Sequence, residues 1–594
     1  MKLRKVFAAF IAAAMVVALA VPASAGQAAY DYAADIAGQK EATALVPAAA
    51  EIGITAADEN GASGVVLTAS PEEGNTTDFY LNALVAGNKV ILTGDIASAV
   101  SSVSGDIAVA DGKAEFVPAP MMLAELVDEV VAVTMADGTV YNVHTVNPLM
   151  PKLNIIVNKV AEENAGFYDF VVDKFLLRVS TAGELVYFRN CNCVGEALMC
   201  ENFAKQGDAY TYFVELQPEY RNANGGYSSG MYVVMDSSYV DVEKVTLAAS
   251  EGHGEGYLDQ HEFVIIEPAH YLLLSYTLEE VNNLPEGVAG IDGTSRTYVW
   301  AGVMQEVKDG ALVAEIDTTD YPLLYESAVE KLDYANATLD GVVVTVGQNE
   351  VPSFADGIMD YVHINSMDYI LNDEGTVAKL LVSMRDQCAV YQFDMATGEI
   401  DWILGGKAST LTGFDEFTTV RTDEMGNEFN ALTYGQHYAR YCEDGDISIF
   451  DNQTGMGPFL RKMPVPTMTR VFKATIDAEA GTATIHDVIN GVDLDEQTGK
   501  YHNSSHCGSV DYFAPTSVLI GWGLHGVIDN LGPFVPEGTQ SDIGFDDLRQ
   551  GSIPIFTELD QTTGEITFEL STERSPLLQS HEGMFSYRTY KSFK

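Results

Sequence analysis

The chain is 594 residues long and carries 85 Asp and Glu side chains against 32 Lys and Arg, which gives a formal net charge of −53 at pH 7. A surface this acidic repels the phosphates of nucleic acids and anionic lipid headgroups, so neither nucleic-acid nor membrane partners are expected. An anionic substrate would need a local basic pocket.

Residues 1–25 show the three-part pattern of a secretory signal peptide. Three basic side chains among the first five residues precede an apolar run, and the small-residue ending "ASA" at 23–25 predicts cleavage after Ala25. A membrane anchor is the alternative, but the apolar run is short for a span and a cleavage site follows it. We therefore expect an exported protein, secreted or periplasmic, without a membrane span.

The next segments divide into a lead-in, a small domain and a long domain. Residues 26–50 are rich in Ala and lack a period, which predicts a flexible lead-in. Residues 51–148 contain short alternating runs broken by Gly, Asn and Asp, such as "KVILTG", and predict an N-terminal β-sandwich domain. Residues 149–594 form the long domain, and this part repeats.

A turn containing Gly followed by a strand that begins Glu-Ile or Glu-Leu recurs along the long domain, as in "DMATGEIDW" and "DQTTGEITF". The turns are about 85 residues apart from the second onward, and a degenerate copy fills the wider first gap; their glycines are Gly183, Gly310, Gly398, Gly481 and Gly564. Six units of this length predict a six-bladed β-propeller. Two unrelated β-sandwiches would not explain the recurring turn. Helical periodicity is confined to "TLEEVNNL" (277–284) and "YESAVEKLDYA" (325–335).

Six cysteines in an exported chain permit disulfides, and the sequence does not fix their pairing. Their spacing does not fit a zinc knuckle, so structural disulfides or buried thiols are the favoured interpretations. They are Cys191, Cys193, Cys200, Cys388, Cys442 and Cys507.

Four stretches place a histidine or an arginine among polar neighbours beside an expected strand: 259–266, 360–370, 380–394 and 434–441. Taken singly, each is most simply a hydrogen-bonded structural residue or an ion pair. In a propeller the four can converge on the axis, where three histidines could also hold zinc. The chain lacks an HExxH motif and has an arginine in the set, so an anion site is favoured over a metal site.

The same stretches carry a resemblance to a known family. "DQHE", "HINSMDYI", "SMRDQCAVYQFDMATGEIDWILGG" and "QHYARY" followed by "GDISIFDN" together resemble the bacterial aryl-sulfate sulfotransferases over roughly residues 145–594. That family implies a six-bladed propeller with a small N-terminal β-domain, exported from the cytoplasm. It also implies transfer of a sulfuryl group from an aryl sulfate ester to a phenol, without a nucleotide sulfate donor, a metal or another cofactor.

The resemblance implies a role for each of five residues. His437, in the Gln-His motif, is the expected nucleophile that carries the sulfuryl group as a sulfohistidine. The expected sulfuryl-binding residues are His261, His363, Asn365 and Arg385. His253 competes with His261 for its role, and the bulky Tyr438 stands where the family has a small or acidic residue. The resemblance leaves a homodimer open.

Two rival functions remain open from the sequence. The first is a metal-dependent sulfate-ester hydrolase, although the chain lacks the Cys/Ser-x-Pro-x-Arg motif of the familiar sulfatases. The second is a propeller that binds a ligand without catalysis, which would leave the convergent His, Asn and Arg set unexplained.

Overall fold

The computed structural model describes residues 54–593, apart from 63–64, 66, 73, 95–99, 106, 192–199, 216–227, 330–333, 338–341, 347–348, 354–359, 424, 454–468, 501, 505, 514–515, 524–552 and 574–585. The expected signal peptide (1–25) and flexible lead-in (26–50) lie outside the described residues, as does Cys193. The described part is mostly β, arranged in antiparallel sheets of four or five strands.

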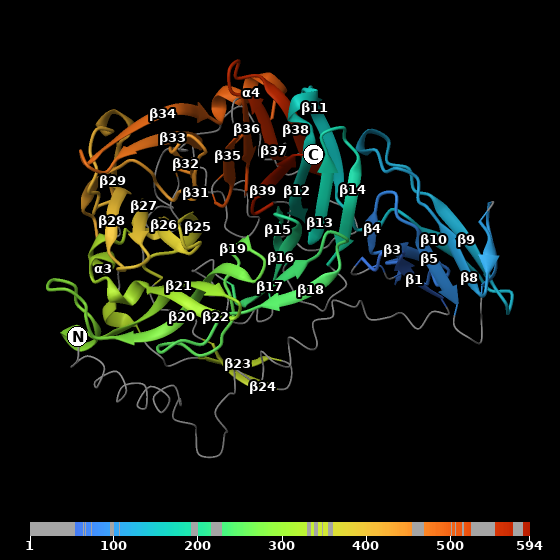
Figure 1. Ribbon diagram of the computed structural model, residues 1–594, viewed down its shortest axis with the longest axis horizontal. Coiled ribbons are helices and arrows are strands. Elements are labelled where there is room, and N and C mark those ends of the chain that lie inside the picture. The colour runs from blue at the N-terminus through green and yellow to red at the C-terminus, as the bar shows by residue number, and fades with distance from the viewer. Residues whose placement is uncertain are drawn as a thin grey trace.

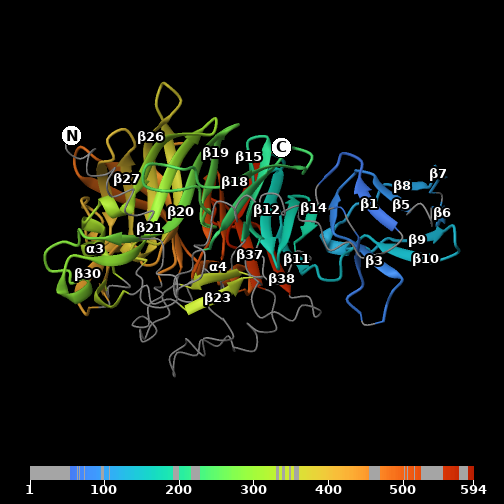
Figure 2. The same ribbon diagram turned by 90° about the horizontal axis from the view of Figure 1, so that it is seen from below.

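The N-terminal strands form two sheets that lie beside the rest of the molecule in both views (blue in Figure 1 and Figure 2). One sheet has the order β1 (Ile54–Asp58), β5 (Val90–Gly94), β8 (Lys113–Phe116) and β7 (Val109–Ala110). The other has the order β2 (Leu67–Ala69), β3 (Asp78–Leu81), β10 (Val140–His144), β9 (Val130–Met135) and β6 (Val100–Val103), with β10 parallel to β3.

Six further sheets follow one another around a common centre (Figure 1). Three are β39 (Thr589–Phe593), β12 (Gly166–Val172), β13 (Phe175–Ser180), β14 (Leu185–Asn190) and β4 (Ala83–Val85); β15 (Cys200–Gln206), β16 (Ala209–Glu215), β17 (Gly230–Met235) and β18 (Asp241–Val245); and β19 (Phe263–Glu267), β20 (His270–Val281), β21 (Thr297–Lys308) and β22 (Ala311–Asp317).

The other three are β25 (Ile364–Leu371), β26 (Val377–Met384), β27 (Ala389–Asp394) and β28 (Ile400–Gly405); β31 (His437–Tyr441), β32 (Ile447–Asp451), β33 (Arg470–Asp477) and β34 (Thr482–Asn490); and β35 (Ser509–Phe513), β36 (Ser517–Gly521), β37 (Ile553–Asp560), β38 (Ile566–Glu573) and β11 (Lys152–Asn158). Two small hairpins stand apart, β23 (Val342–Val346) with β24 (Asn349–Ser353) and β29 (Thr419–Thr422) with β30 (Glu428–Ala431).

Two strand pairs join the beginning of this ring of sheets to its end. The C-terminal strand β39 pairs with β12, and β11 pairs with β38, both antiparallel. The N-terminal region is attached as well, because β4 pairs with the outer strand β14. The strands nearest the centre are therefore β39, β15, β19, β25, β31 and β35, one in each sheet.

The recurring glycine turn joins the third and fourth strands, counted from the centre, of five of the sheets, where each glycine has a positive φ between 67° and 85°. In the β15–β18 sheet the corresponding turn lacks a glycine, and Tyr239 takes the left-handed conformation with φ 62°. The turn therefore occupies the same place in each of these sheets, in agreement with its recurrence in the sequence.

Helices in the described segments are short: α3 (Leu323–Ser327), α4 (Val492–Thr498) and the 3-10 turns η2 (Leu123–Glu125), η3 (Glu162–Asn164), η5 (Ile291–Gly293), η6 (Thr318–Asp320), η7 (Tyr334–Asn336), η8 (Arg385–Gln387) and η9 (Asp415–Phe417). The helix expected at 277–284 is wrong. Thr277–Val281 continue β20, because each of these residues pairs with a residue of β21. None of the described helices is long and apolar enough to cross a membrane.

Candidate active site

The predicted site residues lie where innermost strands begin. His437 is the first residue of β31, His363 directly precedes β25, and His261 lies two residues before β19. The register of β25 shifts between Ile364 and Ser366, and that of β31 shifts between His437 and Arg440. Such bulges re-aim side chains at the end of a strand, and they are frequent beside active sites.

The structure brings all five predicted residues together at this end of the ring, and all are buried. The rings of His261 and His363 are 5.0 Å apart, edge to face. Asn365 Nδ2 donates to the carbonyl of Gln436 at 2.7 Å, directly before His437. The backbone N–H of Arg385, in η8, donates to the carbonyl of His363 at 2.9 Å. Four separate segments of the chain therefore share one small volume.

His437 is held through both ring nitrogens. Nδ1 lies 2.8 Å from Asn452 Oδ1 and 3.0 Å from the carbonyl oxygen of Gly435. Nε2 accepts a hydrogen bond from the backbone N–H of Cys507 at 3.2 Å. Burial, and then the positive charge of Arg385, hold the pKa of His437 well below its usual range. The imidazole is therefore neutral at neutral pH.

Carboxylates orient the other basic groups. Asp360 accepts from His363 twice, from the backbone N–H at 2.8 Å and from Nδ1 at 2.9 Å. Asp259 holds His261 in the same two ways, and Asp386 pairs with Arg385. Burial lowers the pKa of His363 despite its bond to Asp360. With Nδ1–H donated to a carboxylate, neutral His363 presents a lone pair on Nε2.

The sequence profile of the arylsulfotransferase (ASST) family matches residues 285–588, just over half of the 594 residues. The chain belongs to the arylsulfotransferase family. The matched span contains His363, Asn365, Arg385 and His437, whereas His261 precedes it.

Solved structures similar to this arylsulfotransferase share little sequence with it. A protein of unknown function from Bacteroides caccae is 8% identical with a TM-score of 0.35, over 72% of this chain and 98% of that one. A putative 6-phosphogluconolactonase from Bacteroides fragilis is 10% identical with a TM-score of 0.29, over 73% and 99%. BamB from Moraxella catarrhalis is 11% identical with a TM-score of 0.23, over 61% and 92%. These scores are too low to bear on activity. A search of curated proteins found no match.

Further residues of the arylsulfotransferase site were missed in the sequence. Asn452 follows β32, His506 and Cys507 precede β35, and Tyr587 precedes β39. Burial, and then the charges of Arg385 and His363, lower the pKa of His506 to about 3. The ring of Tyr587 lies 5.4 Å from that of His261. The available signal was position, since "SHCGSV" places a histidine before a strand just as "GQHYAR" does.

Two clusters of His, Asp and Glu bring possible metal-ligand atoms within 4.8 Å of one another. The first, Asp360 with His363 and Asp386, includes the carboxylate that already pairs with the Arg385 guanidinium. A cation there would face that fixed positive charge at close range, so the residues present fit an anion better.

The second cluster explains the placement of His253. Its ring nitrogens lie 3.7 Å from Glu279 and 3.4 Å from Asp317. The pKa of Glu279 is raised to about 7, by burial first and then by Asp317. His253 is thus engaged with carboxylates of β20 and β22, whereas His261 is the histidine whose ring meets His363.

Charged side chains pack against one another one step further along the inner strands. Glu262 accepts from Arg440 at 2.6 Å and from Arg588 at 3.1 Å. The ring of Tyr438 has the Arg440 guanidinium at 3.9 Å and that of Arg588 at 4.8 Å, and its hydroxyl donates to Asp511 at 3.0 Å. Tyr438 therefore belongs to the packed floor of the site.

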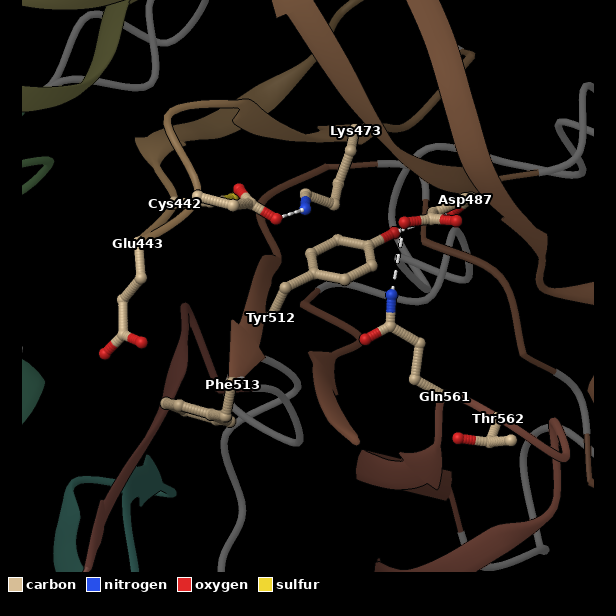
Figure 3. A pocket seen from close by; sticks show the side chains of 9 residues that line it. Cys442, Glu443, Lys473, Asp487, Tyr512, Phe513, Gln561 and Thr562 are labelled. Atoms are coloured by element: carbon tan, nitrogen blue, oxygen red, sulfur yellow. Dashed lines mark hydrogen bonds and ion pairs between the residues drawn. The ribbon is translucent and has the colours of Figure 1, made fainter. Parts of the chain in front are cut away.

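A separate pocket of about 280 Å³ lies at the far end of the β31–β34 and β35–β38 sheets (Figure 3). Its cation, Lys473, pairs with Asp444 and, at 3.1 Å, with Asp446. Tyr512 donates to the carbonyl of Asp487 at 2.9 Å. Two carboxylates neutralise the one lysine among the lining residues, so this pocket offers an anion no comparable site.

Proposed function

We propose that this protein moves a sulfuryl group from an aryl sulfate ester to a phenol in two steps, with His437 carrying the group as a sulfohistidine. Membership of the arylsulfotransferase family supports sulfuryl transfer between small molecules. One observation supports the covalent step above all others: a buried, neutral imidazole lies among Arg385, His363 and His261. A neutral imidazole is a nucleophile at a pH where a free histidine is partly protonated.

In the first step the Cys507 N–H gives up its hydrogen bond to Nε2 of His437, the freed lone pair forms a bond to sulfur, and the bond from sulfur to the aryl oxygen breaks. Its electron pair stays on the phenol oxygen, which takes up a proton from water. In the second step the acceptor phenol gives its proton to a neutral histidine, for which His363 Nε2 is suited, and its oxygen attacks sulfur. The N–S bond breaks and its electron pair returns to Nε2.

The transferring group carries negative charge on its oxygens, as a phosphoryl group does. Arg385 supplies the fixed positive charge, and we assign Asn365, His363 and His261 as the other groups that contact these oxygens. Asn365 has 0% exposure and spends one of its two amide hydrogens on Gln436, so the second can reach the substrate. This local charge reconciles an anionic substrate with the acidic surface.

The remaining architectural assignments belong to the same proposal. The six sheets around the centre correspond to the six blades of a β-propeller (149–594), preceded by a β-sandwich domain (51–148). Export through the N-terminal peptide would place the enzyme outside the cytoplasm. Among the described cysteines, Cys191, Cys200, Cys442 and Cys507 are free thiols, and disulfide bonding stays a prediction.

Intact mass spectrometry tests the covalent step. Brief incubation with a chromogenic aryl sulfate, in the absence of a phenol acceptor, should add one sulfuryl group to the protein, and adding a phenol should remove it. Release of the chromogenic phenol without any adduct, at a rate independent of the acceptor, would replace transfer by hydrolysis.

The second candidate is a metal-dependent hydrolase, and the Asp360–His363–Asp386 cluster, although its arginine neighbour disfavours a cation, is the observation that makes it testable. Treatment with a strong chelator, followed by its removal, should leave turnover unchanged, because imidazole, amide and guanidinium groups perform the charge work. Loss of turnover that one equivalent of zinc or calcium restores would favour the hydrolase.

A further inference from the structure

We infer that Asn452 is the positioning residue of the nucleophile, which sets the orientation of the His437 ring and ties it to the loop that precedes β35. This inference rests on the proposed function. Asn452 directly follows β32 and is fully buried.

The orientation of the Asn452 amide is determined by its partners. Nδ2 donates to the carbonyl oxygen of Ser504 at 3.1 Å and to that of Cys507 at 2.9 Å. Carbonyl oxygens accept and cannot donate, so the NH₂ group must face them. Oδ1 is thereby directed at His437 Nδ1, 2.8 Å away.

This orientation assigns the tautomer of His437. Both atoms next to Nδ1 are acceptors, Asn452 Oδ1 and the carbonyl oxygen of Gly435, so Nδ1 carries the hydrogen. Nε2 is then the nitrogen with the lone pair, which agrees with its acceptance of a hydrogen bond from the Cys507 N–H. Asn452 and Cys507 thus form a closed bridge around the ring, because Asn452 also binds the carbonyl of Cys507.

The choice of an amide has a chemical consequence. A carboxylate beside Nδ1–H would stabilise the positive charge that the ring acquires when Nε2 bonds to sulfur. The neutral amide orients the ring without adding that charge. The sulfuryl group therefore sits on a better leaving group, which favours its onward transfer to the phenol.

Two variants of Asn452 test the assignment. Asn452→Ala removes the bridge, and both half-reactions should slow by about 10–100-fold, the usual cost of losing such an orienting group. Asn452→Asp keeps Oδ1 but sets its second oxygen against two carbonyls, so the buried carboxyl should stay protonated up to an unusually high pH. The Asp variant should therefore approach wild-type rates at acidic pH and lose activity as the pH rises.

The charged groups that lower the pKa of His437 are Arg385, then His363 and His261, and Cys507 is a further titratable residue in contact with the ring; none of the four is substituted in these variants. A new alkaline limb in the Asp variant is therefore attributable to position 452. Asn283→Asp is the matched control, since the Asn283 amide donates to the Thr319 carbonyl at an exposed site. It should keep the wild-type pH profile.

A second measurement separates this inference from the proposed function. In protein labelled with ¹⁵N-histidine, the His437 signals, assigned by their loss in His437→Gln, should show the hydrogen on Nδ1 in wild type and a changed Nδ1–H signal in Asn452→Ala. If wild type forms no sulfuryl adduct, the proposed function fails while the spectra still decide the positioning. Unchanged spectra together with Asn452→Ala rates within about threefold of wild type would overturn it.

Discussion

At one end of the ring, inner strands begin with left-handed residues that carry side chains: His363 has φ 44°, Tyr438 has φ 52° and Cys507 has φ 60°. At the other end, five hairpins with the recurring turn place a glycine in this conformation, such as Gly310 and Gly398 with φ values of 74° and 70°, and Tyr239 takes it with φ 62° in the sixth. The same backbone conformation costs a side-chain residue of order 1 kcal/mol or more, and a glycine very little. The strain at the first end is compensated by buried hydrogen bonds such as those of His437 and Asn452. The comparison teaches that one end of the sheets is built for turning the chain and the other for aiming functional groups.

Removal of His437, the proposed nucleophile, should cause the largest loss of activity of any change at either end. His437→Ala should lower kcat/KM for sulfuryl transfer by at least about 10⁴-fold, because the carrier atom is lost. The covalent adduct should disappear as well, as measured by intact mass. If the variant still accumulates a sulfated protein, another residue is the nucleophile.

Substitution of a basic residue at each end of the ring should change kcat by amounts that differ by orders of magnitude. Arg385→Lys keeps the charge but loses the planar fork, and we expect a decrease of about 10²–10³-fold in kcat. Lys473→Ala, in the pocket at the opposite end, should leave kcat within about twofold. Near-normal turnover of Arg385→Lys would reduce that arginine to a structural ion pair.

The pH dependence of the reaction should reflect the buried end. Because burial lowers the pKa of His437 below the ordinary value of 6.5, the ring stays deprotonated as the pH falls through 6.5. The kcat/KM of the wild-type enzyme should therefore keep its value as the pH falls through 6.5, where a free imidazole becomes half protonated. An acid limb centred at 6.5 or above would show that the nucleophile is not desolvated as described.

The hairpin end should respond in stability alone, and weakly. Gly310→Ala meets nothing within 4 Å, but it requires a positive φ of 74°. We expect about 1 kcal/mol of destabilisation in chemical denaturation and an unchanged kcat. Gly183→Ala should destabilise the protein more than Gly310→Ala, because its added Cβ would lie 2.6 Å from Ile155 Cδ1. If the two changes destabilise the protein equally, the close contact with Ile155 makes no measurable contribution.

Local chemistry explains which features the sequence could predict. The recurring glycine turn fixes φ through a single residue, so the outer hairpins were predictable from spacing. The helix expected at 277–284 failed because partner residues 297–301, distant in sequence, draw Thr277–Val281 into a strand.

The residues of the candidate site likewise divide into those that the sequence could predict and those that it could not. The five predicted residues lie in segments with recognisable sequence motifs, and the structure brings them together. Asn452 and His506 were missed because their roles arise from contacts between strands and between sheets: Asn452 reaches His437 on the neighbouring strand of the same sheet, 15 residues away, and Cys507 before the next sheet, 55 residues away. Such contacts follow from the pairing of strands and the order of the sheets, which no local pattern encodes.

The closure of the ring also determines when the site can assemble relative to synthesis of the chain. Arg588 stands beside the last inner strand, β39, and its guanidinium binds Glu262 and the carbonyl of Asn365. A ribosome makes β39 more than 400 residues after β12, its partner in the sheet. The floor beneath the nucleophile therefore cannot exist while the chain is still growing. Contacts between residues this far apart in the sequence form slowly. Activity therefore requires that β39 has been synthesised and that it has paired with β12.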